Sequence, residues 1–529
     1  MGSLKVLDVT LRDGGCVNNF NFGQIYISKI LSSLEASGVD VIELGYLDDK
    51  NGSEVERTQY INEKVIEQYV LKHKVEGKTY VAMMDYGKFD VNNLSQRSDN
   101  GIDGIRLAFH KKDVLNIIPL GKEIMKKGYK LYIQPMITLR YTDEELLNLI
   151  KLVNVELPNA AGFYIVDSFG EMRPNDMNRV LNIVDHNLLE TMTLGFHSHN
   201  NLQMSYANAC ALLQFPTNRN IMIDSSVMGM GKGAGNLNTE LLLEHLNLFY
   251  GKNYIIQPLL EVIDKVINQL HSEFYWGYAV EYYLSSANHC TPSYASYFYN
   301  KHMLPIDQVG ELLNTISEDK KISFDRDYAE KLYQEFNKRK SVDDVLIVKE
   351  LKKELCNKTI LLIAPGKSIS KAHEIINNFA SKKDVVTISL NVLSDIPFNY
   401  ILTTREDVYL QALENASSII VPSNISKGGR GDVKVLDYRK WIDSDENTRD
   451  SSTVIMMNLL RSCNVKNIIL AGFDGFSSNI NDNYYDMTLR RPVNELQAKE
   501  RNNYYKQYFA KLRVSGINIK FITPSLYDC

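Results

Sequence analysis

Three residues of this 529-residue sequence have the types and the spacing of a metal site. Asp13 lies in TLRDGG, and His197 and His199 lie in HSHN. Two histidines two positions apart on a strand project from the same face, so both imidazoles can bind one ion. A third ligand from Asp13 leaves positions open for substrate oxygens, where a divalent metal polarises a carbonyl and favours enolate chemistry. A His-x-His pair can also be simply packed or exposed, but its combination with TLRDGG favours the metal site.

The elements that must position these residues follow a regular rhythm up to about residue 231. Short apolar strand-like runs alternate with amphipathic stretches such as 24–36 and 143–153. The eight runs cover 5–10, 39–46, 79–86, 104–109, 129–136, 161–168, 193–200 and 221–229. This number and length predict a (β/α)8 TIM barrel, in which catalytic groups follow the C-terminal ends of the strands. Asp13, the two histidines and the glycine-rich GMGKGAGN all stand at such ends.

The rest of the chain predicts two further segments. We expect an α/β TIM-barrel domain over 1–250 and a helical extension over 251–355 that completes the active site or forms a dimer interface. From Lys358 the strand and helix rhythm restarts, with strand-like runs at 358–363, 384–391, 399–404, 417–423, 467–475 and 517–525. This rhythm predicts a Rossmann-like α/β domain over 356–529. Its turn APGKSIS (364–370) can offer backbone N–H groups to an anion, but it lacks the spacing of a P-loop or a dinucleotide site.

Composition narrows the class of partner. The formal net charge is -5, and Lys and Arg form no basic stripe, so we expect a small-molecule substrate and no nucleic acid. Apolar runs long enough to cross a membrane are missing from the sequence. The six cysteines form no CxxC pair, which argues against a zinc ribbon or a disulfide scaffold. Together these features predict a cytoplasmic enzyme that does not associate with membranes.

Six motifs carry a resemblance to a known family. They are DVTLRDGG (8–15), VIELGY (41–46), IQPMITLRYTDEEL (133–146), VDSFG (166–170), GFHSHNNLQMSYANA (195–209) and DSSVMGMGKGAGNLNTE (224–240). Over about 1–290 the sequence resembles the HMG-CoA lyase-like superfamily, the DRE-TIM metallolyases. Within it, the sequence is most similar to the 4-hydroxy-2-oxovalerate aldolase family.

The resemblance implies a metal-dependent carbon–carbon lyase that forms or cleaves a bond of a 4-hydroxy-2-oxoacid. A pyruvate enolate is the implied intermediate, and an aldehyde is the other partner. Asp13, His197 and His199 would ligate Mn²⁺ or Mg²⁺, with Asn236 as a further ligand. Arg12 would lie against the enolate oxygen, where its fixed charge stabilises the anion.

The resemblance fails at the position of the general base. Aldolases of this kind carry a histidine three residues after the ligating aspartate, but this sequence has Cys16 there. Cys16 can act as the base only if the metal and Arg12 lower its pKa, and it can equally be a bystander. Tyr282 or Tyr283, which resemble a tyrosine of the aldolases' C-terminal helical region, and His289 are the other candidates.

Three more polar residues on strands have two interpretations each. Asp167 and Glu43 can hydrogen-bond substrate or other site groups, or they can satisfy neighbouring backbone. Arg106 can bind a carboxylate of the substrate or form an ion pair inside the barrel.

Residues 358–529 are loosely similar to the Rossmann-like domains of bacterial sialyltransferase-like and motility accessory factor proteins. This similarity implies a nucleotide or sugar-nucleotide ligand, or a role in assembly. The pairing of domains suggests a hypothesis of surface-sugar metabolism, and we also expect a homo-oligomer. Two alternative functions stay open at this point. One is an acyl-CoA-dependent Claisen condensation like that of isopropylmalate synthase relatives, and the other is a non-catalytic ligand-binding scaffold.

Overall fold

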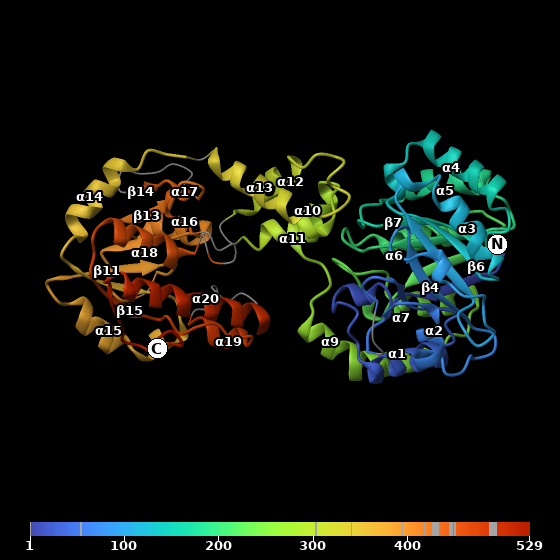
Figure 1. The fold of residues 1–529 in the computed structure, drawn as a ribbon, viewed down its shortest axis with the longest axis horizontal. Coiled ribbons are helices and arrows are strands. Elements are labelled where there is room, and N and C mark those ends of the chain that lie inside the picture. Colours follow the sequence, from blue (N-terminus) through green and yellow to red (C-terminus); the bar gives the residue numbers. More distant parts are fainter. Residues whose placement is uncertain are drawn as a thin grey trace. The chain divides into compact units, whose positions relative to one another are not determined.

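The computed structural model divides the chain into two compact units, each with its own sheet (Figure 1). Unit 1 contains Met1–Ser296 and Lys321–Ser323, and unit 2 contains Tyr297–Lys320 and Phe324–Cys529. The structure describes every residue except 1, 53–55, 302–303, 340, 394, 417, 426–432, 444–447, 449–450, 486–492, 494 and 529.

Unit 1 is a closed barrel of eight parallel strands. They are β1 (Leu4–Asp8), β2 (Val41–Leu47), β4 (Thr79–Asp85), β5 (Gly104–Phe109), β6 (Lys130–Pro135), β7 (Gly162–Asp167), β8 (Thr193–Ser198) and β9 (Ile221–Ser225). Strand β1 pairs in parallel with both β9 and β2, which closes the sheet, and the short β3 (Gln59–Tyr60) extends it beside β2. Each strand overlaps one expected run, so the predicted TIM barrel is confirmed.

Helices surround the strands of the barrel. They are α1 (Gln24–Ser37), α2 (Glu63–Val65), α3 (Ile117–Lys126), α4 (Asp143–Glu156), α5 (Pro174–Asn187), α6 (Ser205–Gln214), α7 (Thr239–Tyr250), α8 (Gln257–Val262) and α9 (Asn268–Glu273). The start of α4 shows how the local sequence sets a boundary. The Thr142 hydroxyl accepts from the Glu145 N–H, and the Glu145 carboxylate accepts from the Thr142 N–H. This reciprocal cap satisfies two N–H groups that the helix cannot pair internally.

The inside of the barrel is filled by apolar side chains. The buried cluster there consists of Leu7, Val9, Val41, Val81, Tyr132, Tyr164, Val166 and Met222. A second, larger cluster lies between the strands and the helices. Above this apolar layer, polar groups gather toward the end of the barrel where the strands finish, here called the barrel mouth.

The segment after α9 up to Ser296 lies against the loops of the barrel mouth. It contains α10 (Val280–Ala287) and the first part of α11 (Pro292–Tyr299). The Trp276 indole N–H donates to the Met228 carbonyl after β9 at 3.0 Å, and the Ser286 hydroxyl donates to the Phe169 carbonyl after β7 at 2.5 Å. The first part of the expected extension therefore packs on the loops that follow two barrel strands. Residues 297–320 and 324–355 belong instead to unit 2.

Unit 2 contains a parallel sheet of seven strands in the order β14-β13-β12-β11-β10-β15-β16. The strands are β10 (Thr359–Ile363), β11 (Val385–Leu390), β12 (Tyr400–Leu402), β13 (Ile419–Pro422), β14 (Val433–Leu436), β15 (Asn467–Ala471) and β16 (Asn518–Phe521). Six of them match expected runs, and β14 was not expected, because this short edge strand is only half-buried and lacks a clear apolar run. The α/β class of this region is confirmed, and its Rossmann-like nature stays a prediction.

Unit 2 also contains the α-helices from α12 onward. They are α12 (Ile306–Asn314), α13 (Arg326–Lys338), α14 (Val345–Leu355), α15 (His373–Ala380), α16 (Glu406–Asn415), α17 (Tyr438–Trp441), α18 (Ser452–Ser462), α19 (Ile480–Asn483) and α20 (Glu495–Val514). The unit has a hydrophobic core of its own, formed by strands and helices of residues 351–527.

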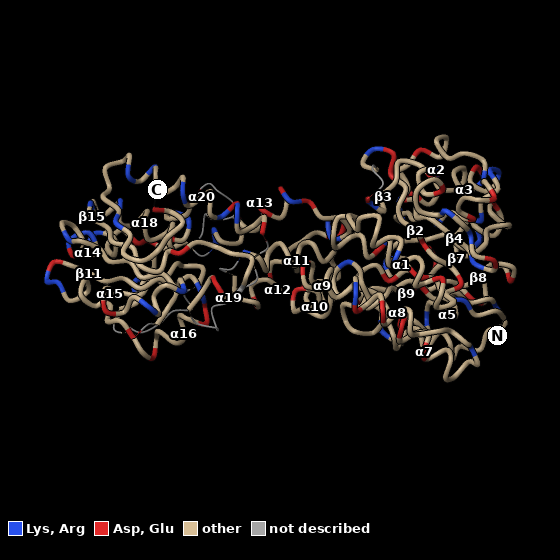
Figure 2. Tube along the Cα trace, turned by 90° about the horizontal axis from the view of Figure 1, so that it is seen from below, with Lys and Arg blue, Asp and Glu red and all other residues tan. Residues whose placement is uncertain are grey.

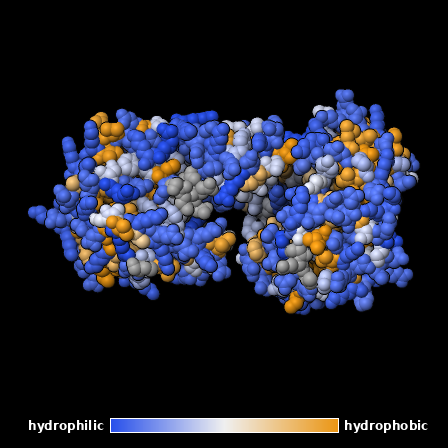
Figure 3. All heavy atoms as spheres, viewed as in Figure 1, coloured by the Kyte–Doolittle hydropathy of each residue, from blue (hydrophilic) through white to orange (hydrophobic). Residues whose placement is uncertain are grey.

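Residues of both charge signs are interspersed along the chain in both units (Figure 2). The visible face in Figure 3 is largely hydrophilic, with apolar side chains interspersed. Exposed large apolar residues include Leu248 and Phe249 on α7 and Ile255 just before α8. They offer a candidate surface for the expected homo-oligomer, which stays a prediction. Among the described helices, none has the length and hydropathy needed to span a bilayer.

Because each unit has its own hydrophobic core, a mutation in one core should lower the stability of that unit alone. Leu362 in β10 is fully buried, so Leu362→Ala should destabilise unit 2 by about 2 to 5 kcal/mol through lost burial and a residual cavity. Scanning calorimetry should show the transition of unit 2 at lower temperature and that of unit 1 unmoved. The matched control is Leu410→Ala on α16, whose residue is 52% exposed. Equal shifts in the two variants, or a shift of both transitions by Leu362→Ala, would contradict the division into two cores.

Candidate metal centre at the barrel mouth

Asp13, His197 and His199 meet at the barrel mouth and are all buried. The Nε2 atoms of His197 and His199 lie 3.4 and 3.7 Å from Oδ2 of Asp13. Metal–ligand bonds of about 2.1 Å place neighbouring ligand atoms roughly 3 to 3.5 Å apart. The three side chains thus already have nearly the separations that one bound cation requires.

The other nitrogen of each imidazole is held by the protein. Nδ1 of His197 lies 3.0 Å from the carboxylate of Asp224, and Nδ1 of His199 lies 3.1 Å from the carbonyl oxygen of Lys232. Because a carbonyl oxygen only accepts, the proton of a neutral His199 belongs on Nδ1, and its Nε2 presents a lone pair to Asp13. A lone pair facing a carboxylate calls for a cation between them, as in metal sites where a second partner fixes the imidazole.

Asn236 supplies a further oxygen at the same place. Its residue is 2% exposed, its Nδ2 donates to the Met230 carbonyl, and its Oδ1 is buried without a hydrogen-bond partner among the described residues. The glycine-rich loop permits this approach, since a Cβ on Gly231 would lie 2.2 Å from Nδ2 of Asn236 and 3.0 Å from Oδ1 of Asp13. A buried, unpaired oxygen beside three ligand groups fits a divalent metal.

The charge states of the candidate ligands also suit the binding of a metal ion. Burial alone would raise the pKa of Asp13, but Arg12 and the two imidazoles hold that pKa well below its usual range. Burial lowers the pKa of His199 to about 4, so this ring is neutral near pH 7. Burial opposes a charge on His197 too, but hydrogen bonds with Asp13 and Asp224 raise its pKa.

Arg12 lies directly beside the three ligand groups. Its Nη1 donates to Oδ2 of Asp13 at 2.6 Å, and its Nε donates to Oε2 of Glu43 at 2.7 Å. Its Nη2 is buried and has no hydrogen-bond partner among the residues that the structure describes. The Nη2 group of a rigidly held guanidinium is therefore left to donate to an oxygen of a substrate.

Arg106 and Asp224 connect this arginine back to the metal ligands. Glu43 also accepts from Nη1 of Arg106 at 3.0 Å, and Nη2 of Arg106 donates to Asp224, the partner of His197. The six side chains Asp13, Arg12, Glu43, Arg106, Asp224 and His197 thus form a closed ring of polar contacts. Glu43 and Arg106 pair inside the barrel, which is one of the two interpretations that the sequence allowed.

Cys16 lies near the ligands but in an unfavourable environment for a base. Its backbone N–H donates to the Asp13 carbonyl in the turn after β1, and the residue is exposed. The dense protein around the thiol and the charge of Asp13 raise the pKa of Cys16, and the nearby Arg12 and Lys232 do not reverse this direction. The protein groups around Cys16 therefore do not lower its pKa, as a role as general base would require.

The other expected bases occupy the segment that packs on the mouth. Nδ1 of His289 lies 2.6 Å from Glu171 in the loop after β7, and Arg140 donates to the His289 carbonyl. Tyr282 interacts with Ser296, and burial raises its pKa, whereas Tyr283 is 44% exposed. Asp167 accepts from the N–H groups of the loop that carries Glu171, so it satisfies neighbouring backbone.

Sequence reasoning missed two groups of the site. Asp224 and Lys232, which fix the two imidazoles, lie within the DSSVMGMGKGAGN motif, but nothing in the sequence pairs them with particular histidines. Tyr46 and Asp85 are the second group, and they share a side-chain hydrogen bond close to Arg12. Polar residues at or near the ends of β2 and β4 were the available signal for this pair.

Known proteins similar to this chain match its N-terminal half. The model of the family described as HMGL-like matches residues 3–253. A 4-hydroxy-2-oxovalerate aldolase of Geobacillus genomosp. 3 is 29% identical over 282 residues, which are 49% of this chain and 78% of that protein. The 4-hydroxy-2-oxovalerate aldolase 2 of Comamonas testosteroni is 28% identical over 45% of this chain and 67% of its own length.

A solved structure is similar to about half of the chain. The HMG-CoA lyase from Brucella melitensis is 14% identical, with a TM-score of 0.41, over 51% of this chain and 99% of its own. The family match covers the barrel, the ligand triad and the loop that carries Asn236. The barrel of this chain, over residues 3–253, therefore matches the model of the HMGL-like family.

Proposed function

We propose that the barrel is a divalent-metal-dependent aldolase that cleaves or forms a carbon–carbon bond of a 4-hydroxy-2-oxoacid. The observation that carries this proposal is the convergence of Asp13, His197 and His199 beside the buried, unpartnered Nη2 of Arg12. The names of the relatives from Geobacillus and Comamonas support the same class of reaction. Mn²⁺ and Mg²⁺ both suit a site with carboxylate and amide oxygens and two imidazoles.

The chain's own residues stabilise the charge that develops in this reaction. A metal ion held by Asp13, His197, His199 and Asn236 would act as a Lewis acid that polarises the ketone of the 2-oxoacid. Nη2 of Arg12 donates to the oxygen that becomes negative when the C3–C4 bond breaks. Glu43 and Asp13 fix the guanidinium beforehand, so little reorganisation is needed as charge develops.

Proton transfer completes the reaction. In the cleavage direction the C4 hydroxyl loses its proton, the C3–C4 bond breaks, and an aldehyde and a pyruvate enolate form. The enolate then takes up a proton at C3 to give pyruvate. Cys16, Tyr282, Tyr283 and His289 stay predictions for the group that accepts the hydroxyl proton. The hydrogen-bonded pair Tyr46 and Asp85 is an additional candidate, because it lies near Arg12.

Removal of the carboxylate ligand tests the metal centre. Asp13→Ala should abolish tight binding of Mn²⁺ in calorimetric titrations and the Mn²⁺-dependent exchange of pyruvate methyl protons in heavy water. The physical reason is that two imidazoles alone leave the cation without its anionic ligand. His186→Ala on α5 is the matched control, because its exposed ring contacts the Asn182 carbonyl of the same helix. A wild-type protein that neither binds nor exchanges with added Mn²⁺ would refute the proposed function.

Arg12→Lys tests the stabilisation of the enolate. A lysine has one nitrogen and cannot contact Asp13, Glu43 and a substrate oxygen in a fixed fork. We expect kcat for cleavage to fall about 100- to 1,000-fold, the usual effect of losing one preorganised donor. Mn²⁺ affinity should change much less. Arg179→Lys, at an exposed ion pair with Asp143 on the helical shell, should leave kcat unchanged. Similar kcat values for Arg12→Lys and wild type would assign Arg12 a purely structural role.

Cys16→Ala separates a bystander from a base. Because its surroundings raise the pKa of this thiol, little thiolate exists near neutral pH, and we expect cleavage to retain more than about a tenth of its rate. Cys210→Ala on α6 controls for loss of a thiol elsewhere in the barrel. A drop beyond about 100-fold in kcat with KM unchanged would instead assign Cys16 to proton transfer.

A further inference from the structure

Unit 2 has a cavity of about 210 Å³ at the C-terminal ends of its strands. Gly366 follows β10, Asn391 follows β11, Thr404 follows β12 and Phe473 follows β15, and all four line the cavity. In the order of the sheet, β10 lies between β11 and β15, so the strand order changes direction there. Open parallel sheets bind ligands in the crevice outside such a reversal point.

The base of this cavity is closely packed backbone. Gly472 has φ +75°, and a Cβ on it would lie 2.0 Å from the Ala364 carbonyl oxygen. A Cβ on Gly366 would lie 2.2 Å from the Gly472 carbonyl oxygen. Two glycines without side chains let the loops after β10 and β15 touch, which leaves a preformed space above them.

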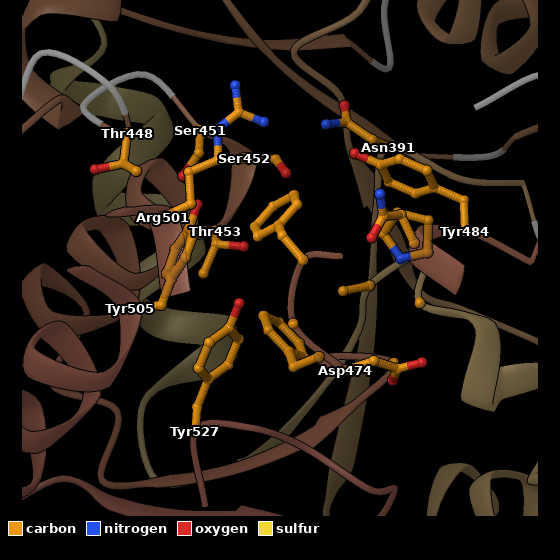
Figure 4. A pocket seen from close by; sticks show the side chains of 18 of the residues that line it. Asn391, Thr448, Ser451, Ser452, Thr453, Asp474, Tyr484, Arg501, Tyr505 and Tyr527 are labelled. Carbon is orange, nitrogen blue, oxygen red and sulfur yellow. The ribbon is translucent and has the colours of Figure 1, made fainter. Parts of the chain in front are cut away.

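Aromatic side chains form much of the wall. The cavity is lined by Phe473, Phe476, Tyr484, Tyr505 and Tyr527. Figure 4 shows Tyr505 and Tyr527 on one side and Tyr484 on the opposite side. The Phe476 and Tyr505 rings stack with centroids 6.2 Å apart and an interplanar angle of 23°. Flat apolar walls of this kind fit a planar heteroaromatic ring.

Positive groups lie at one end of the same space. The guanidinium of Arg501, from α20, lies 5.4 Å from the centroid of the Phe476 ring. Ser451 and Ser452 line the cavity at the start of α18, whose first turn carries no acidic residue. Figure 4 shows Arg501 on the same side as these serines. A guanidinium and a helix N-terminus together favour an anionic group.

Asn391 faces this end from the other side of the cavity (Figure 4). Its left-handed backbone, with φ +56°, is held by the Thr404 N–H, which donates to its Oδ1 at 2.7 Å. Its Nδ2 donates to the Thr404 hydroxyl at 3.1 Å. The amide is therefore fixed in place before any ligand arrives.

The turn APGKSIS does not provide the anion site that the sequence allowed. The Ser368 N–H donates to the Asp474 carboxylate at 2.7 Å, and the Ser368 hydroxyl donates to the same carboxylate. A carboxylate of the chain therefore occupies the position that a phosphate would take. Arg501 and the N-terminus of α18, which also line the cavity, are the groups that we assign to an anion instead.

We propose that this cavity binds a nucleoside phosphate. The base packs against the aromatic wall beside Tyr484, and the phosphate binds at Arg501 and the N-terminus of α18. The assignment concerns unit 2 alone and is independent of the function proposed for the barrel.

Calorimetric titration of the full chain tests this site with four probes: a nucleoside monophosphate, a nucleoside diphosphate, the matching nucleoside and inorganic phosphate. The titrations cover the uridine, cytidine, adenosine and guanosine series. In at least one series, the nucleotide should bind more tightly than the nucleoside and more tightly than inorganic phosphate. Arg501→Gln should weaken nucleotide binding about 10-fold or more, the loss expected for a charge-assisted contact, and should leave nucleoside binding unchanged. Tyr484→Ala should weaken both.

Arg513→Gln is the matched control, because it removes the same charge from the same helix outside the cavity. Arg501 and Tyr484 are both only half-buried, so both variants should fold, as circular dichroism can verify. No binding of any nucleotide at millimolar concentration would overturn the proposal. So would inorganic phosphate or a nucleoside that binds as tightly as the nucleotide, or nucleotide binding that neither variant weakens.

Discussion

The barrel mouth depends on a closed ring of buried charged and polar side chains. Asp13, Glu43 and Asp224 alternate with Arg12 and Arg106, and His197 closes the ring. Each charge would be costly to bury alone, and each is tolerated because the next one compensates it. With neutral imidazoles, three carboxylates against two guanidinium groups leave a net negative charge, which a divalent cation at Asp13 offsets. The ring thus explains both the position of the metal ligands and the fixed direction of Arg12.

The fold makes this ring possible because parallel strands deliver side chains to one end. Asp13 follows β1, Glu43 lies on β2, Arg106 on β5, His197 on β8 and Asp224 on β9. Strand β1 closes the sheet by pairing with both β2 and β9, so residues more than 200 positions apart become neighbours. The apolar filling beneath them excludes water from below.

The candidate sites of the two units are built from different kinds of groups. The barrel builds its site from charged side chains whose mutual contacts fix their positions. The C-terminal sheet builds its cavity from close-packed backbone and aromatic rings, with one guanidinium at its edge. The first arrangement suits charge development in a reaction, whereas the second suits recognition of a flat ligand.

The sequence by itself determined the barrel and its eight strands, and it singled out the three residues of the candidate metal site. Strand periodicity is a local property, and the spacing of His197 and His199 on one strand face needs no tertiary information. It also predicted six of seven strands in unit 2, but not the half-buried edge strand β14. This strand lacks a clear apolar run and is held in the sheet by its pairing with β13. Only the tertiary structure decided that Asp224 and Lys232 fix the imidazoles, and that Ser368 gives its N–H to Asp474. It also decided that the surroundings of Cys16 raise its pKa. These outcomes depend on distances between segments far apart in the chain, and on burial, which local sequence patterns do not encode.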